Sequence, residues 1–202
     1  INDMCDRCIW MDQGHIIMDG PAKEVTEAYA EEIRKRDESD MLERFRRRIG
    51  PVNYTAGFSV DSLDFLDNDG NAKLVWQSNQ EIKVRFSVDC SLPVKKPDFR
   101  ITFEKIDGNI LLENTSKNDG FSVESIEGIA EFEIDFGKLG FGQDTYEARL
   151  ELWETAPPTQ PELLASFSNV IRVDRPLDVL DSPAYFHEVY LAVNRPTNRE
   201  EG

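Results

Sequence analysis

Cys5 and Cys8, separated by two residues, have a spacing that could serve as a metal-ligand pair or as a redox pair. A structural zinc site takes four ligands, from a second cysteine pair or from histidines. The chain has only one further cysteine and two histidines, His15 and His187. We therefore interpret Cys5 and Cys8 as small residues at a helix end, and we expect no metal and no cofactor.

A second motif, Asp67-Asn68-Asp69-Gly70, has the oxygen-rich composition of a calcium loop. The EF-hand pattern would require an acidic residue at Phe65 and a glutamate at Trp76, so it fails at both positions. Asp-Gly steps are typical of tight turns, where glycine takes a positive φ. We predict a hairpin turn here, and further turns at Asp107-Gly108 and Asp119-Gly120.

The strongest candidate for ligand recognition is Trp153, in a segment where apolar and polar residues alternate. The alternation directs Trp153 away from the core, to the same face as Arg149 and Glu151. A flat aromatic ring can stack on the C–H face of a sugar while charged groups bind its hydroxyls. The alternatives are a tryptophan covered by residues 155–161 or one turned into the core by strand twist.

In an immunoglobulin-like strand order, residues 146–153 lie between residues 99–105 and residues 167–173. The polar faces of these segments would form one surface. Its candidate glycan-binding residues are Trp153, Arg149, Glu151, Arg100, Thr102, Ser168 and Arg172. Outward carboxylates are too common on the strands to identify a catalytic pair, and His187 is the only histidine near them, so we expect no catalytic site.

These candidates require a sheet, which period-two alternation predicts. Seven to eight strands are expected, with no helix between them, at residues 57–65, 74–76, 82–88, 99–105, 110–112, 129–136, 146–153 and 167–173. A change of phase at Asp61 and Ser62 predicts a β-bulge, and Trp76 is expected in the core. The predicted fold class is mainly β, an immunoglobulin-like antiparallel β-sandwich with a short N-terminal hairpin and a helical linker.

Charge restricts the possible partners. The 202 residues include 39 acidic and 23 basic side chains, for a net charge of −16. Such a surface repels the phosphates of nucleic acids and anionic lipids, so no nucleic-acid partner is expected. No apolar stretch reaches the roughly 18 residues of a membrane-spanning helix, and no signal peptide opens the chain. A low, odd number of cysteines favours a reducing cytoplasm.

The first fifty residues follow a different pattern. Residues 5–21 predict a helix end and two strands joined by a tight turn, and a helix starts at Ala22. Residues 31–49 are highly charged, with a narrow apolar stripe of Met41, Phe45 and Ile49 and an arginine cluster of Arg44, Arg46, Arg47 and Arg48. We interpret them as a solvated linker helix that stops at Gly50-Pro51. The alternative is that the arginines contact a partner.

The hairpin and the start of the helix resemble the end of an ABC-transporter nucleotide-binding domain. The matching residues are Cys5-Asp6-Arg7, Trp10-Met11-Asp12-Gln13-Gly14, Gly20, Glu24-Val25 and Tyr29. The subtype is similar to the ATPase subunit of bacterial polysaccharide exporters. The resemblance implies that the ATP-binding elements precede Ile1. No G-x-x-x-x-G-K-[ST] loop or LSGGQ-type signature occurs, so we expect no ATP hydrolysis by this chain, but expect an ABC-type ATPase in its full-length parent.

Residues 57–175 resemble the C-terminal carbohydrate-binding domain of O-antigen polysaccharide exporter ATPases. The matching stretches are Asp107-Gly108-Asn109-Ile110, Gly140-Phe141-Gly142 before Tyr146, and Ile171-Arg172-Val173. The resemblance implies non-catalytic recognition of the non-reducing end of a lipid-linked O-antigen polysaccharide. It also implies a cytoplasmic location at the inner face of the bacterial inner membrane, and a transmembrane exporter subunit as partner through the missing nucleotide-binding domain. The alternatives are a purely structural oligomerisation domain and a glycan-modifying enzyme.

Residues 184–193 form an expected strand that is apolar on both faces, unlike a normal solvent-exposed edge. Residues 175–183 are long enough to carry this strand to a second subunit. Because ABC ATPases of this type work in pairs, we expect a homodimer that exchanges the strand. The alternative is that it closes its own sheet. The expected domains are a nucleotide-binding-domain remnant (1–30), a helical linker (31–53), a glycan-binding β-sandwich (54–175), and a linker with a dimerising strand (176–202).

Overall fold

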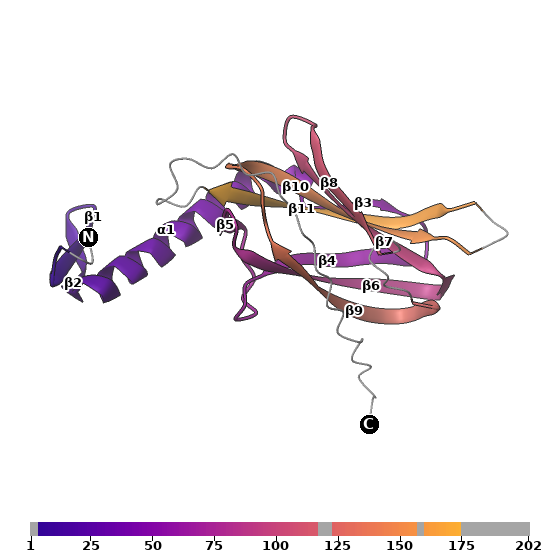
Figure 1. Ribbon diagram of the computed structural model, residues 1–202, viewed down its shortest axis with the longest axis horizontal. Coiled ribbons are helices and arrows are strands. Elements are labelled where there is room, and N and C mark those ends of the chain that lie inside the picture. The colour runs from indigo at the N-terminus through magenta and orange to yellow at the C-terminus, as the bar shows by residue number, and fades with distance from the viewer. Residues whose placement is uncertain (1–3, 117–122, 157–159, 175–202) are drawn as a thin grey trace, which may run out of the picture. The chain divides into compact units, whose positions relative to one another are not determined.

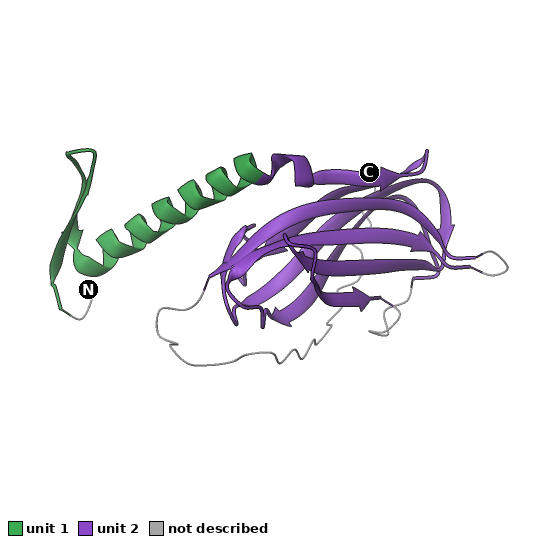
Figure 2. Ribbon diagram, turned by 90° about the horizontal axis from the view of Figure 1, so that it is seen from above, with its two compact units in different colours: residues 1–44 green, residues 45–202 purple. Residues whose placement is uncertain are grey.

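The computed structural model describes residues 4–116, 123–156 and 160–174. The chain forms two compact units, unit 1 at Ile1–Arg44 and unit 2 at Phe45–Gly202 (Figure 2).

Unit 1 is a β-hairpin followed by a long helix. Strand β1 (Arg7–Asp12) pairs antiparallel with β2 (His15–Pro21), and helix α1 (Ala22–Phe45) follows directly. Trp10 of the hairpin packs edge-on against Tyr29 of α1, with ring centroids 5.5 Å apart. Ion pairs one turn apart, such as those of Arg34 with Glu31 and Glu38, stabilise the helix along its own surface.

The predicted hairpin is confirmed, but several local details differ from the sequence interpretation. Cys8 lies in β1, and Cys5 precedes it in a non-helical segment, so neither is at a helix end. Helix α1 continues across residue 30 and ends at Phe45, where a short 3₁₀ helix, η1 (Arg46–Arg48), follows. Ile49 therefore does not extend the helical stripe, and Gly50-Pro51 begins a strand.

Unit 2 is a β-sandwich of two sheets, seen as two layers in Figure 1. The larger, called here the six-stranded sheet, has the order β3 (Gly50–Tyr54), β11 (Glu162–Asp174), β10 (Asp144–Glu154), β7 (Pro97–Lys105) and β8 (Ile110–Thr115), with β5 (Val75–Gln77) parallel to the end of β11. The three-stranded sheet has the order β4 (Phe58–Leu66), β6 (Glu81–Lys95) and β9 (Ser125–Lys138).

The predicted fold class is confirmed. The eight strands expected between residues 57 and 173 are present, and β3 is a further strand that was not predicted from the sequence. The strand expected at residues 184–193 lies outside the described residues. The predicted bulge is also confirmed, because the pairing of β4 with β6 shifts between Val60 and Ser62. As a result Val60, Leu63 and Phe65 are all buried, although the first differs in parity from the other two.

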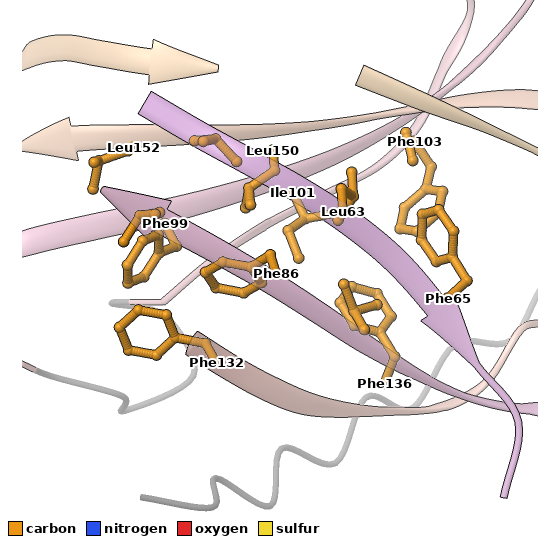
Figure 3. Packing of buried hydrophobic residues seen from close by; sticks show 14 of the residues in the cluster. Leu63, Phe65, Phe86, Phe99, Ile101, Phe103, Phe132, Phe136, Leu150 and Leu152 are labelled. Carbon is orange, nitrogen blue, oxygen red and sulfur yellow. The ribbon is translucent and has the colours of Figure 1, made fainter. Parts of the chain in front are cut away.

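Aliphatic and aromatic side chains fill the space between the sheets (Figure 3). Phe86, Phe99 and Phe132 form one cluster, with centroid separations of 5.0, 5.2 and 4.8 Å. Phe103 anchors a second cluster and contacts Phe65, Phe136 and Phe141. Trp76 is buried, as predicted. Such pairs add to the stabilisation that comes from burying apolar area.

The start of β10 is fixed by a buried tyrosine. Tyr146 donates a hydrogen bond from its hydroxyl to the carbonyl oxygen of Gly142, at 2.7 Å. A tyrosine that bonds back to backbone a few residues upstream is the tyrosine corner of immunoglobulin-like sandwiches. This bond ties the first part of β10 to the segment that precedes the strand.

A mostly buried carboxylate on β10, Glu147, ties η1 to the six-stranded sheet. Arg48 donates to Glu147 Oε2 at 2.9 Å, while Arg149 and the Ser168 hydroxyl each donate to Oε1 at 3.1 Å. Burial alone would raise the pKa of this carboxyl, but the donors outweigh burial and the pKa of Glu147 is lowered. One member of the arginine cluster therefore contacts its own sandwich.

Replacing Glu147 with glutamine should lower the free energy of unfolding by about 1–2 kcal/mol at neutral pH, a value reduced because both arginines are partly exposed. A carboxyl whose pKa is lowered by folding stabilises the fold above its unfolded pKa, and this stabilisation is lost as the pH falls through the folded pKa. The difference in the free energy of unfolding between wild type and E147Q should therefore become smaller at acidic pH. Urea denaturation followed by circular dichroism, at neutral and at acidic pH, measures this difference.

The matched control is Glu127→Gln, which removes an exposed carboxylate on β9. It should change the free energy of unfolding by no more than about 0.5 kcal/mol. Equal losses in the two variants, or a Glu147 effect that does not depend on pH, would contradict this account of the linkage.

Candidate functional site

The candidate residues lie on the outer face of the six-stranded sheet, the face turned away from the three-stranded sheet. Strand β10 runs between β7 and β11, as predicted. In this register Glu151 is opposite Arg100, and Arg149 is opposite both Thr102 and Ser168. Directly paired residues point to the same side of a sheet, so these side chains share one face.

Trp153 is half-buried and forms the centre of a compact cluster on this face. Its indole nitrogen donates to Glu151 Oε2 at 2.8 Å. The guanidinium carbon of Arg100 lies 4.3 Å from the ring centroid, in a cation–π contact. The structure therefore brings together Arg100, Glu151 and Trp153, which we call the Trp153 cluster. Arg100 covers one face of the ring.

Two buried polar residues hold Arg100 in place. Asp98 is only 2% exposed, and its carboxylate accepts hydrogen bonds from Arg100 Nε at 3.2 Å and from the Ser116 hydroxyl at 2.8 Å. The Ser116 oxygen in turn accepts from the backbone N–H of Phe99 at 2.9 Å. A series of hydrogen bonds therefore connects the Arg100 guanidinium, through Asp98 and Ser116, to the backbone of Phe99.

Neither of these positioning residues was predicted from the sequence. Asp98 is in phase with Arg100, so extending the expected strand by two residues would have placed it on the same face. Ser116 carried no such signal, because it follows a strand that was expected to end at residue 112 and instead reaches Thr115.

The other predicted residues do not join the Trp153 cluster. Arg149 is bonded to Glu147, and its Nε is buried without a hydrogen-bond partner among the described residues. Thr102 is half-buried opposite Arg149. Arg172 pairs with Asp174 and lies opposite Thr145, eight positions from Trp153 along β10, or about 25 Å at the usual rise per residue.

Ser168 requires a correction. It is on the predicted face, but it is fully buried, and its hydroxyl donates a hydrogen bond to Glu147. A ligand on the surface cannot reach it directly. The alternation of polar and apolar residues gives the face of a strand residue, but it does not show whether that face is covered at a given position.

The turn motif that resembled a calcium loop is a hairpin turn. Gly70 donates its N–H to the carbonyl of Asp67 at 2.9 Å, and Leu66 bridges to Ala72. The Lys73 ammonium pairs with the Asp67 carboxylate and lowers the pKa of that carboxyl to about 2. Gly108 closes a second turn by donating to Lys105, whereas Asp119-Gly120 lies outside the described residues.

Within residues 4–116, 123–156 and 160–174, no group of three or more Cys, His, Asp or Glu side chains is arranged to hold a metal ion. The same parts of the chain contain no helix that is long and apolar enough to cross a membrane.

No protein-family model matches the chain. No curated protein matches it. Among solved structures, it is similar to the crystal structure of the C-terminal domain of Wzt, with a TM-score of 0.54 and 13% identity over 72% of this chain and 90% of that chain. It also matches the crystal structure of a Niemann-Pick type C2 protein from Japanese carpenter ant, with a TM-score of 0.47 and 10% identity over 62% of this chain and 98% of that chain. The first likeness shows a shared β-sandwich fold.

Proposed function

We propose that this chain is a non-catalytic glycan-recognition module that binds O-antigen polysaccharide, at its non-reducing end, for export by an ABC transporter. The observation that carries the proposal is the Trp153 cluster on the outer face of the six-stranded sheet. It combines an aromatic ring, a carboxylate and a guanidinium, which are the groups that stack on sugar rings and bond to their hydroxyls.

The cluster is also held in place before any ligand arrives. The hydrogen bond from Trp153 to Glu151 restricts the indole, and Asp98 restricts Arg100. Side chains that are already ordered lose less conformational freedom on binding, so more of the contact energy remains as affinity. This feature favours a recognition surface over a tryptophan without a binding role.

Two further observations support the export context. The sandwich shares its fold with the C-terminal domain of Wzt. The resemblance of residues 1–30 to the end of a nucleotide-binding domain points to the same kind of protein. In this proposal a nucleotide-binding domain joins the module to the exporter at the cytoplasmic face of the inner membrane. The chain itself does not hydrolyse ATP.

We also propose that the module works as a homodimer through the strand expected at residues 184–193, which lies outside the described residues. The observation in favour is strand β9, which spans 14 residues and has a single strand neighbour, β6, in the described part of the sandwich. A long edge of this kind accepts a further strand from another chain. A purely structural oligomerisation domain is the second candidate function, and it differs from the first in predicting no glycan binding.

Trp153→Ala should weaken polysaccharide binding by at least about 1 kcal/mol, roughly fivefold, because the ring contact is lost. Isothermal titration against purified O-polysaccharides with different terminal sugars measures the loss. The matched control is Tyr54→Ala, which removes a 76% exposed ring on β3 and should leave the affinity unchanged. Both variants should keep the circular dichroism spectrum of the wild type.

An unchanged affinity in W153A would show that the glycan binds to another surface. No binding of any O-polysaccharide by the wild type would instead favour the structural oligomerisation domain.

Deleting the residues after Pro176 should convert the protein from dimer to monomer, because the exchanged strand is removed. Multi-angle light scattering gives the mass, and the circular dichroism spectrum of the sandwich should be retained. A truncated chain that remains a tight dimer would show that this strand is not the dimerising element.

A further inference from the structure

We propose that the Trp153 cluster selects neutral glycans over glycans that carry carboxylate or phosphate groups, and that Glu151 sets this preference. The inference rests on the proposed glycan-binding function and adds to it the chemical class of the sugar. It follows from how the charges on the outer face of the six-stranded sheet are paired.

Each arginine on this face is already bonded to a carboxylate of the same chain. Arg100 is bonded to Asp98, and Arg172 is bonded to Asp174. The shared carboxylate of Glu147 accepts from both Arg149 and Arg48. An anionic sugar would have to compete with these carboxylates, which are held at 2.9–3.2 Å from the guanidinium nitrogens.

Glu151 differs from these paired arginines, because no cation is bonded to its carboxylate in the described part of the chain. Its Oε2 accepts from the Trp153 indole, which is neutral, and it forms no ion pair within the described part of the chain. Its cross-strand neighbour Arg100 is bonded to Asp98 instead. A ligand bound at the Trp153 cluster therefore lies beside a carboxylate that has no ion-pair partner among the described residues.

The charges around the Trp153 cluster are also predominantly negative. Arg48, Arg100, Arg149 and Arg172 share this face with more carboxylates than their own number, namely Asp98, Glu104, Glu113, Glu147, Glu151 and Asp174. The whole chain carries a net charge of −16. Like charges placed next to one another in an interface cost affinity and suppress the wrong partner.

A neutral sugar is not repelled by these carboxylates. Its hydroxyls can donate hydrogen bonds to the Glu151 carboxylate, and bonds to a charged acceptor are stronger than bonds between neutral groups. The same carboxylate thus both holds the indole and discriminates between sugars. We assign Glu151 as the specificity-determining residue of the cluster.

The test uses acidic O-polysaccharides that contain uronate and the same polysaccharides after their uronates have been reduced to hexoses. Each pair has one sequence of sugars and differs in charge. Wild type should bind the reduced form about tenfold more tightly than the acidic form in isothermal titration at about 0.1 M salt. Because the discrimination is electrostatic, the ratio should shrink at about 1 M salt.

Glu151→Gln keeps an oxygen that can accept from the Trp153 indole and removes the charge. It should reduce the tenfold ratio to less than about threefold. The matched control, Glu113→Gln, removes an exposed carboxylate from β8 on the same face. It should lower the ratio much less than Glu151→Gln does, because β8 lies two strands away from β10.

The inference is overturned if wild type binds the acidic form as tightly as the reduced form, or if E151Q leaves the ratio unchanged. Failure of every polysaccharide to bind, acidic or reduced, would contradict the proposed function itself, and the inference with it.

Discussion

The side chains of β10 alternate between two environments, and the rest of the sandwich depends on this alternation. Tyr146, Ala148, Leu150 and Leu152 are buried between the sheets. Because a strand has a period of two, their burial forces the residues between them onto the outer face. The same apolar contacts that hold the two layers together therefore also fix Glu147, which anchors η1, and Glu151, which holds the indole of Trp153.

Features that depend on short-range pattern could be predicted from the sequence. The alternation of apolar and polar residues predicted the strands, the phase change at Asp61 and Ser62 predicted the bulge, and the phase of Trp76 predicted its burial. The outward placement of Arg100 and Glu151 followed from the same rule. These predictions succeeded because each depends on neighbours in the chain and on one buried face, both of which are visible in the sequence.

Features set by contacts between distant segments could not be predicted. Strand β3 is short and begins with Gly50-Pro51, which is a helix-stop signal, yet it pairs with β11. Ser168 has the parity of an exposed residue but is buried, and the buried carboxylate of Asp98 accepts a hydrogen bond from Ser116, which lies beyond the next strand of the chain. Pairing of this kind over long sequence separations leaves no periodic signal in the sequence.

The claim that the Trp153 cluster recognises a glycan can be tested directly by nuclear magnetic resonance. The chain has three tryptophans, Trp10, Trp76 and Trp153, so a ¹H–¹⁵N spectrum contains three indole signals, which single Trp→Phe variants assign. On titration with a polysaccharide that binds, the signal of Trp153 should shift, while those of Trp76 in the core and Trp10 in unit 1 should not. Saturating binding that leaves the Trp153 indole signal in place would contradict the account.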